Sequence, residues 1–236
     1  MTKSELKSII NECLDERFLL EKMDIDDGSK GDTLYKPVFI VLLYSDSDFD
    51  HKAEKFVKNQ EFWHASIGFG ASLSKTYSFN FGECEANKIK GGLSYESFSF
   101  YKSEHPTGTM EVSCIFVSKA KYDQLRTVLD YYIENKEKTK YSFINLAYSL
   151  FGKAKKNGMK FNLVCSTFVD TILKSVNVKL NDKQTNLVKP DDLKYNDSKE
   201  KQFKLFKGKI VDYKPEEAHK MVEKLANKES SNYFGR

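Results

Sequence analysis

The amino-acid sequence predicts an α+β protein with a central antiparallel β-sheet of about five to six strands, flanked by helices. Short apolar runs rich in β-branched and aromatic residues fill the first half of the chain, which contains most of the expected strands. Helical spacing of apolar residues dominates the second half. The 18 Phe and 13 Tyr among 236 residues also favour a well-filled core with substantial β structure.

The expected elements begin with a helix that lies outside the sheet. Residues 2–23 open with the capping-box pattern Thr2-x-x-Glu5 and carry an apolar stripe, which predicts an added N-terminal amphipathic helix. Residues 37–44 form a continuous apolar run, typical of a central strand covered on both faces. Residues 45–59 have acids early and lysines late, as a helix does. Further strands are expected at residues 63–70, 73–81, 94–101 and 109–118.

Helices are expected to follow at residues 119–137, 142–151 and 165–176, before a corner at 189–192, a strand at 203–213 and an exposed helix at 215–227. These patterns divide the chain into three parts. Residues 1–32 form the N-terminal helix and a connection dense in turn-forming residues, and residues 33–213 form the folded domain. Residues 214–236 form a C-terminal helix and a polar tail.

Composition disfavours several classes of function. The net charge of +4 is spread along the chain, so neither nucleic acid nor a membrane surface is an expected partner. No apolar run approaches the ~18 residues of an integral membrane segment. The first residues lack the pattern of a signal peptide, which predicts a cytoplasmic protein. The cysteines form no CxxC pair, and there is no HExxH or glycine-rich phosphate loop, so we expect neither a metal nor a cofactor.

Two residues stand out as candidates for chemistry. His64 opens an alternating segment in which it shares a strand face with Ser66 and Gly68. Cys165 ends an apolar run and begins a helical pattern, so its thiol is expected at a helix N-terminus, where the dipole favours the nucleophilic thiolate. A helix-terminal cysteine and a strand histidine together suit nucleophilic catalysis. The alternative for His64 is a core histidine satisfied by one hydrogen bond.

Several segments together resemble the circularly permuted NlpC-type papain-like cysteine hydrolases, which are distantly similar to lecithin retinol acyltransferase-like proteins. The matching segments are His64-Ala-Ser-Ile67, Thr76-Tyr-Ser-Phe79, Gly91-Gly-Leu93, Val164-Cys-Ser-Thr-Phe-Val169 and Val188-Lys-Pro-Asp-Asp-Leu193. The histidine strand precedes the cysteine helix, which is the permuted order. The resemblance covers about residues 36–213 and implies a permuted papain-like catalytic domain.

The resemblance implies roles for individual residues. Cys165 matches the nucleophile and His64 the general base, and the position of the third residue, which orients the imidazole, falls on Ser78. A hydroxyl holds an imidazole more weakly than a carboxylate does, so Thr76 and Asn80, on the same strand face, remain alternatives.

An oxyanion-stabilising tyrosine is implied at Tyr141, with Tyr148 as the alternative. The backbone N–H of Cys165 is a second oxyanion donor, expected from its place at a helix N-terminus.

The function expected from these residues is that of a cysteine peptidase or amidase acting through a thioacyl-enzyme intermediate on a peptide or peptidoglycan-like substrate. One alternative is an acyltransferase or thioesterase that acts on lipid-like acyl groups. The other is a catalytically inactive papain-like interaction or structural module. Without a signal peptide, a cell-wall substrate would require release by lysis, association with a phage particle or a dedicated export system.

Overall fold

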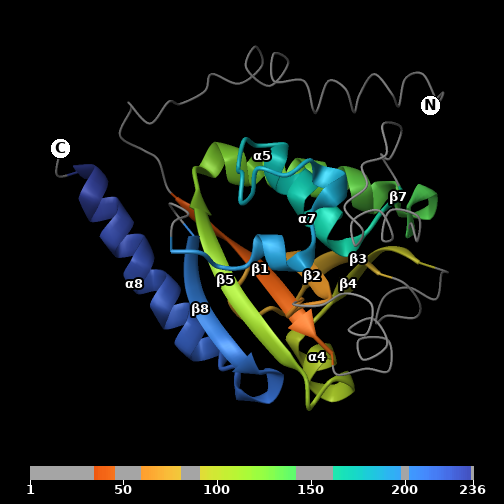
Figure 1. Ribbon diagram of the computed structural model, residues 1–236. Coiled ribbons are helices and arrows are strands. Elements are labelled where there is room, and N and C mark those ends of the chain that lie inside the picture. Colours follow the sequence, from red (N-terminus) through yellow and green to blue (C-terminus); the bar gives the residue numbers. More distant parts are fainter. Residues whose placement is uncertain (1–34, 46–59, 81–90, 142–161, 198–201, 235–236) are drawn as a thin grey trace, which may run out of the picture.

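A computed structural model gives the structure of residues 35–45, 60–80, 91–141, 162–197 and 202–234 (Figure 1). A six-stranded antiparallel sheet forms its centre, in the order β4-β3-β2-β1-β5-β8. The strands are β1 (Lys36–Tyr44), β2 (His64–Gly68), β3 (Thr76–Asn80), β4 (Gly92–Glu96), β5 (Thr109–Val117) and β8 (Gln202–Lys209). The sheet and the helices beside it confirm the predicted α+β class.

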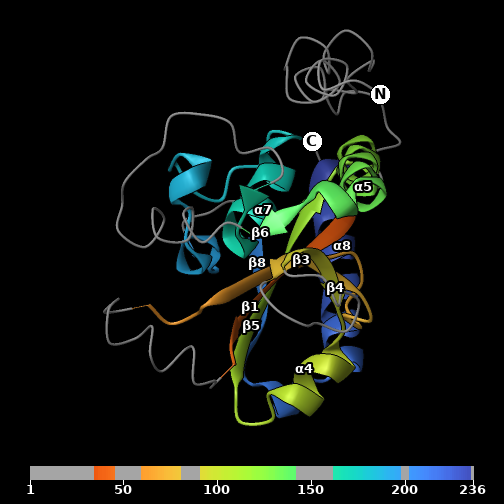
Figure 2. The same ribbon diagram turned by 90° about the vertical axis from the view of Figure 1, so that its right-hand side faces the viewer.

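Within the described residues, four helices pack on the sheet. Helices α5 (Lys119–Glu134) and α7 (Cys165–Lys174) share one hydrophobic core with it, while α4 (Phe98–Glu104) and α8 (Pro215–Phe234) share another. Figure 1 shows α8 running alongside β8, and Figure 2 shows α4 at the end of the sheet away from α5 and α7. Short elements complete the fold: a parallel pair, β6 (Lys140–Tyr141) and β7 (Asn162–Leu163), and the 3-10 turns η1 (Lys136–Lys138), η2 (Thr185–Leu187), η3 (Pro190–Leu193) and η4 (Ile210–Asp212).

Strand β1 contributes side chains to both hydrophobic cores, one on each face of the sheet. Successive side chains of a strand point to opposite faces, so an unbroken apolar run supplies both faces of the sheet. Val38, Ile40 and Leu42 belong to the core under α5 and α7. Phe39 and Val41 belong to the core under α4 and α8. The expected central position of this strand is confirmed.

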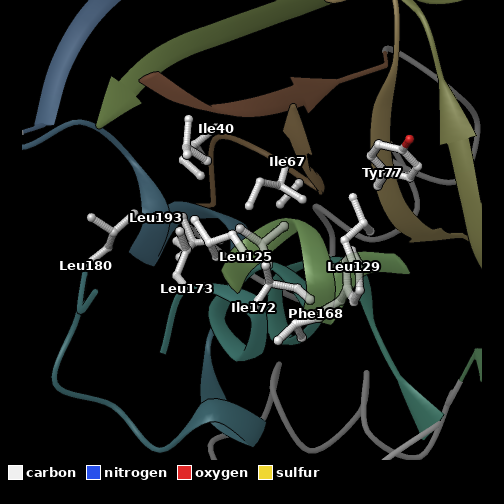
Figure 3. Packing of buried hydrophobic residues seen from close by; sticks show 14 of the residues in the cluster. Ile40, Ile67, Tyr77, Leu125, Leu129, Phe168, Ile172, Leu173, Leu180 and Leu193 are labelled. Carbon is white, nitrogen blue, oxygen red and sulfur yellow. The ribbon is translucent and has the colours of Figure 1, made fainter. Parts of the chain in front are cut away.

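Aromatic and aliphatic side chains fill the core under α5 and α7. The Phe168 ring of α7 lies 5.0 Å from that of Phe79 and 5.4 Å from that of Tyr132, measured between ring centroids. Both distances are typical of favourable aromatic pairs. Figure 3 shows the sheet residues Ile40 and Ile67 on one side of this core and Leu125, Leu129, Phe168 and Ile172 on the other. This packing holds the first turns of α7 against β2 and β3.

The strand expected at residues 94–101 is half wrong, because β4 ends at Glu96 and helix α4 begins at Phe98. Ser97 causes the change: its backbone is extended and its side chain accepts a hydrogen bond from Phe100 N at 3.1 Å. A serine in this position is a favoured N-cap. The strand expected from residue 73 is also shorter, since Leu73 has a φ of 49° and belongs to a turn before β3.

Replacing Ser97 by alanine is expected to lower the free energy of unfolding by about 1 kcal/mol, because the cap of α4 is lost. Replacing Ser97 by aspartate, which also caps helices, is expected to change it less. Urea unfolding of the two variants and the wild type measures the difference. Equal stabilities for all three proteins would contradict the role of Ser97 as a cap.

The C-terminal helix is less exposed than its sequence suggests. Ala218 and Val222 of α8 are buried in the second core, whereas Met221 remains 42% exposed. The helix therefore packs on one face of the sheet, whereas the sequence predicts an exposed helix at residues 215–227. Strand β8 stops at Lys209, and η4 takes up part of the strand expected at 203–213.

Several expected elements lie outside the described residues, namely the helices at 2–23, 45–59 and 142–151. Among the described residues, no helix has the length and apolar character needed to cross a membrane.

Candidate active site

Cys165 is the first residue of α7. Val164 before it is extended, and the Val164 N–H donates to Thr167 Oγ1 at 3.0 Å, which fixes the start of the helix. Cys165 is buried, with 4% of its surface exposed. As the first helical residue, Cys165 has a backbone N–H without an acceptor inside the helix. This N–H is available as an oxyanion donor.

The structure brings Cys165 and His64 together. His64 begins β2, and the preceding carbonyl, that of Trp63, lies 3.8 Å from Cys165 Sγ. The Cys165 side chain also lies near enough to the His64 ring to raise the pKa of the imidazole. The imidazole is 19% exposed, so solvent reaches the pair from one side. A thiol and an imidazole in contact are the minimum requirement for cysteine-based catalysis.

Strands β2 and β3 diverge beside the site. Their ladder pairs only Ile67 with Tyr77 and Gly68 with Thr76, so it stops short of His64. Beyond it, the Ser78 hydroxyl donates to the carbonyl of Ala65 at 2.6 Å, replacing a backbone hydrogen bond. His64 thus lies where the sheet opens toward the N-terminus of α7.

The hydrogen-bond partner that orients His64 is Glu96. His64 Nε2 lies 3.0 Å from Glu96 Oε2, and the carboxylate is only 5% exposed. Glu96 ends β4, which is separated from β2 by β3, so its side chain reaches across one strand. Because the carboxylate binds Nε2, Nδ1 is the ring nitrogen that remains to exchange a proton with a thiol. Cys165, His64 and Glu96 form the candidate triad.

A buried network holds Glu96 in turn. The Tyr101 phenol donates to Glu96 Oε2 at 2.8 Å, and the Asn80 side-chain amide donates to Oε1. The oxygen of Tyr101 also lies 3.0 Å from Ser66 Oγ and 2.6 Å from Thr76 Oγ1. Each of these residues points to the α4 side of the sheet. The carboxylate therefore has fixed partners on both oxygens.

This geometry corrects the expected third residue. Ser78 donates its hydroxyl to the Ala65 carbonyl and does not contact the imidazole. Thr76 and Asn80, the alternatives, reach the site only through Glu96 and Tyr101. All three lie on the expected strand face, but the open ladder and the length of a glutamate side chain place a residue of the next strand against His64.

Sequence reasoning missed Glu96 because residues 94–101 resemble one amphipathic strand. An acidic residue at the end of a strand, followed by a serine cap, is the signal that marks it. Tyr141 lies in β6, where it pairs with Leu163 of β7, two residues before Cys165. The structure does not describe its side chain, and Tyr148 lies outside the described residues.

The charges of His64 and Glu96 stabilise each other. Burial of the His64 ring opposes its protonation, but the negative charge of Glu96, the hydrogen bond with Glu96 and the nearby Cys165 side chain outweigh burial and hold the pKa of His64 well above its usual range. Burial likewise opposes ionisation of Glu96, yet His64, Tyr101 and Asn80 together lower its pKa. Burial and the Glu96 charge raise the pKa of Tyr101, which keeps the phenol a donor. Both pKa shifts favour an imidazolium beside a carboxylate.

No protein-family model, curated protein or solved structure matches the chain. Within the described residues, no group of three or more His, Cys, Asp or Glu side chains is arranged to hold a metal ion.

Proposed function

We propose that the protein is a cysteine hydrolase of the peptidase or amidase type, built on a permuted papain-like fold. The position of Cys165, at a helix N-terminus and beside a histidine that is itself held by Glu96, carries the proposal. A histidine satisfied for structural reasons alone does not need a neighbouring thiol in addition to a buried carboxylate on Nε2. The order of histidine strand and cysteine helix agrees with the permuted arrangement.

In the first half of the reaction, the proton of the Cys165 thiol resides on His64, and the thiolate sulfur attacks the substrate carbonyl carbon. A carbon–sulfur bond forms, and the carbonyl electrons move to an oxyanion that accepts a hydrogen bond from the Cys165 N–H. When the oxyanion collapses, the bond to the leaving group breaks and His64 returns the proton to the departing amine or alcohol. A thioester on Cys165 remains.

In the second half, a water molecule attacks the thioester while His64 accepts a proton from it. The carbon–sulfur bond breaks, and the sulfur leaves as the thiolate beside the imidazolium. The acid product departs. Glu96 does not gain the proton; its charge holds the ring in place and stabilises the imidazolium that forms in each half-reaction.

Iodoacetamide is expected to alkylate Cys165 at least about tenfold faster than Cys114 near neutral pH, because only Cys165 has a histidine beside it. Cys114 is the natural internal comparison, since burial raises the pKa of its thiol to about 12. Replacing His64 by alanine is expected to slow alkylation of Cys165 by about tenfold or more. Peptide mass spectrometry gives the rate for each cysteine.

The matched control is His219→Ala, which removes a histidine that also pairs with a carboxylate, Glu223, but lies exposed on α8. This variant is expected to leave alkylation of Cys165 unchanged. If Cys165 reacts no faster than Cys114, or if the His64 variant reacts as fast as the wild type, the proposed function is wrong.

A further inference from the structure

The corner formed by residues 188–193 lies between the two elements that carry the site. On one side, the Ser166 hydroxyl, in the first turn of α7, donates to the carbonyl of Val188 at 2.7 Å. On the other side, the Asp191 carboxylate accepts from Glu61 N at 2.9 Å and from Phe62 N at 2.8 Å. These two amides come just before His64 in the chain. The corner thus connects the cysteine helix to the histidine strand through hydrogen bonds.

The corner is internally rigid. Pro190 opens the 3-10 turn η3, Lys189 N donates to Asp192 Oδ2 at 2.8 Å, and Asp192 N donates back to Lys189 O at 3.0 Å. The flanking residues Val188 and Leu193 are fully buried. Figure 3 shows Leu193 in the same core as Leu173 and Leu180. Because the turn is rigid, it holds its hydrogen-bond partners at fixed positions relative to one another.

The far end of the corner is fixed to the sheet. The carbonyl of Leu193 accepts from Gln202 Nε2 at 3.2 Å, and Tyr195 N donates to Glu111 Oε1 at 2.6 Å. Lys194 Nζ lies 3.5 Å from Asp191 Oδ2 and 3.1 Å from Glu61 Oε2. The lysine thus partly neutralises the carboxylate without displacing the two amides.

Asp191 fixes the backbone of the segment that leads to the Trp63 carbonyl, which lies beside Cys165. Its two bonds hold Glu61 and Phe62, and the next residue, Trp63, donates its N–H to the Leu43 carbonyl at 2.9 Å. The Trp63 carbonyl then faces Cys165 Sγ, and His64 follows. A shift of this segment would move both the carbonyl and the imidazole relative to the sulfur.

We infer that Asp191 is a positioning residue for the active site: through the corner at residues 188–193 it sets His64 against Cys165. The role of Asp191 in catalysis rests on the proposed function. The chemistry suits the role, because an ionised carboxylate accepts both N–H groups, whereas an asparagine offers one carbonyl oxygen and turns a donor toward the second amide.

The test compares Asp191→Asn with Asp123→Asn, which makes the same chemical change on the exposed surface of α5. Asp123 forms an exposed ion pair with Lys119, and both residues lie outside the corner at residues 188–193. Asp191→Asn is expected to speed hydrogen exchange of the Phe62 amide and to slow alkylation of Cys165 about tenfold, because small displacements at a catalytic pair have large effects on rate. Asp123→Asn is expected to change neither quantity.

The pH titration of the His64 ring, followed by NMR, gives a readout that does not depend on hydrolase activity. We expect its midpoint to move in Asp191→Asn and to stay in Asp123→Asn. Faster Phe62 exchange with an unchanged His64 midpoint would overturn the inference, as would equal effects of the two variants. If wild-type Cys165 reacts no faster than Cys114, the proposed function fails, while the His64 titration still decides the role of Asp191.

Discussion

Replacing Glu96 by glutamine is expected to slow alkylation of Cys165 by about 10²-fold near neutral pH, which is within the range attributed to acid–base groups. The glutamine keeps the size of the side chain but removes the charge that favours imidazolium. The pKa of His64, held well above its usual range by Glu96, is expected to fall, because burial of the ring then acts unopposed by that charge. A neutral His64 ring stabilises the Cys165 thiolate less than an imidazolium does.

Two measurements check this prediction on the same protein. The first is the rate of Cys165 alkylation, and the second is the NMR titration of the His64 ring, assigned by comparison with His64→Ala. Glu223→Gln is the control, since Glu223 pairs with His219 in the same chemical manner but at the exposed surface of α8. If Glu96→Gln leaves both the rate and the His64 titration unchanged, Glu96 does not orient or charge the imidazole.

Local sequence patterns were sufficient for the parts of the fold that depend on neighbouring residues. The apolar run of β1 predicts a doubly covered strand, and the shift in periodicity at Cys165 predicts the start of α7. His64 and Cys165 were found because each occupies a distinctive position within its own segment. Their contact follows once a helix N-terminus packs beside the strand that carries the histidine.

Glu96 could not be found in this way because its role depends on pairing between distant strands. The register of β3 and β4 places it opposite Thr76, and the early end of the β2–β3 ladder leaves His64 open to a side chain from one strand farther away. Neither the register of β3 and β4 nor the length of the β2–β3 ladder can be predicted from the residues near His64. The cap at Ser97, which ends β4 at Glu96, is a local signal, but in the sequence it competes with the apolar alternation of residues 94–101.

Removing the carboxylate altogether, with Glu96→Ala, is expected to reduce the free energy of unfolding by about 3–5 kcal/mol where the pair is fully charged, because one partner of a buried pair is left alone. Tyr101 and Asn80 also lose their acceptor. Asp123→Ala is the control: it breaks an exposed ion pair with Lys119 and is expected to cost less than about 1 kcal/mol.

The stabilisation by the pair is expected to depend on pH in both directions. Folding raises the pKa of His64 above its ordinary value of 6.5, so this contribution is complete below pH 6.5 and is lost as the pH rises through the folded-state pKa. Folding lowers the pKa of Glu96 below 4.5, so its contribution is complete above pH 4.5 and is lost as the pH falls through the folded-state pKa. The stability difference between wild type and Glu96→Ala should therefore be greatest between pH 4.5 and 6.5. Urea unfolding of both proteins across the pH range measures this difference, and a difference that is constant with pH would show that the pair is not ionised in the folded protein.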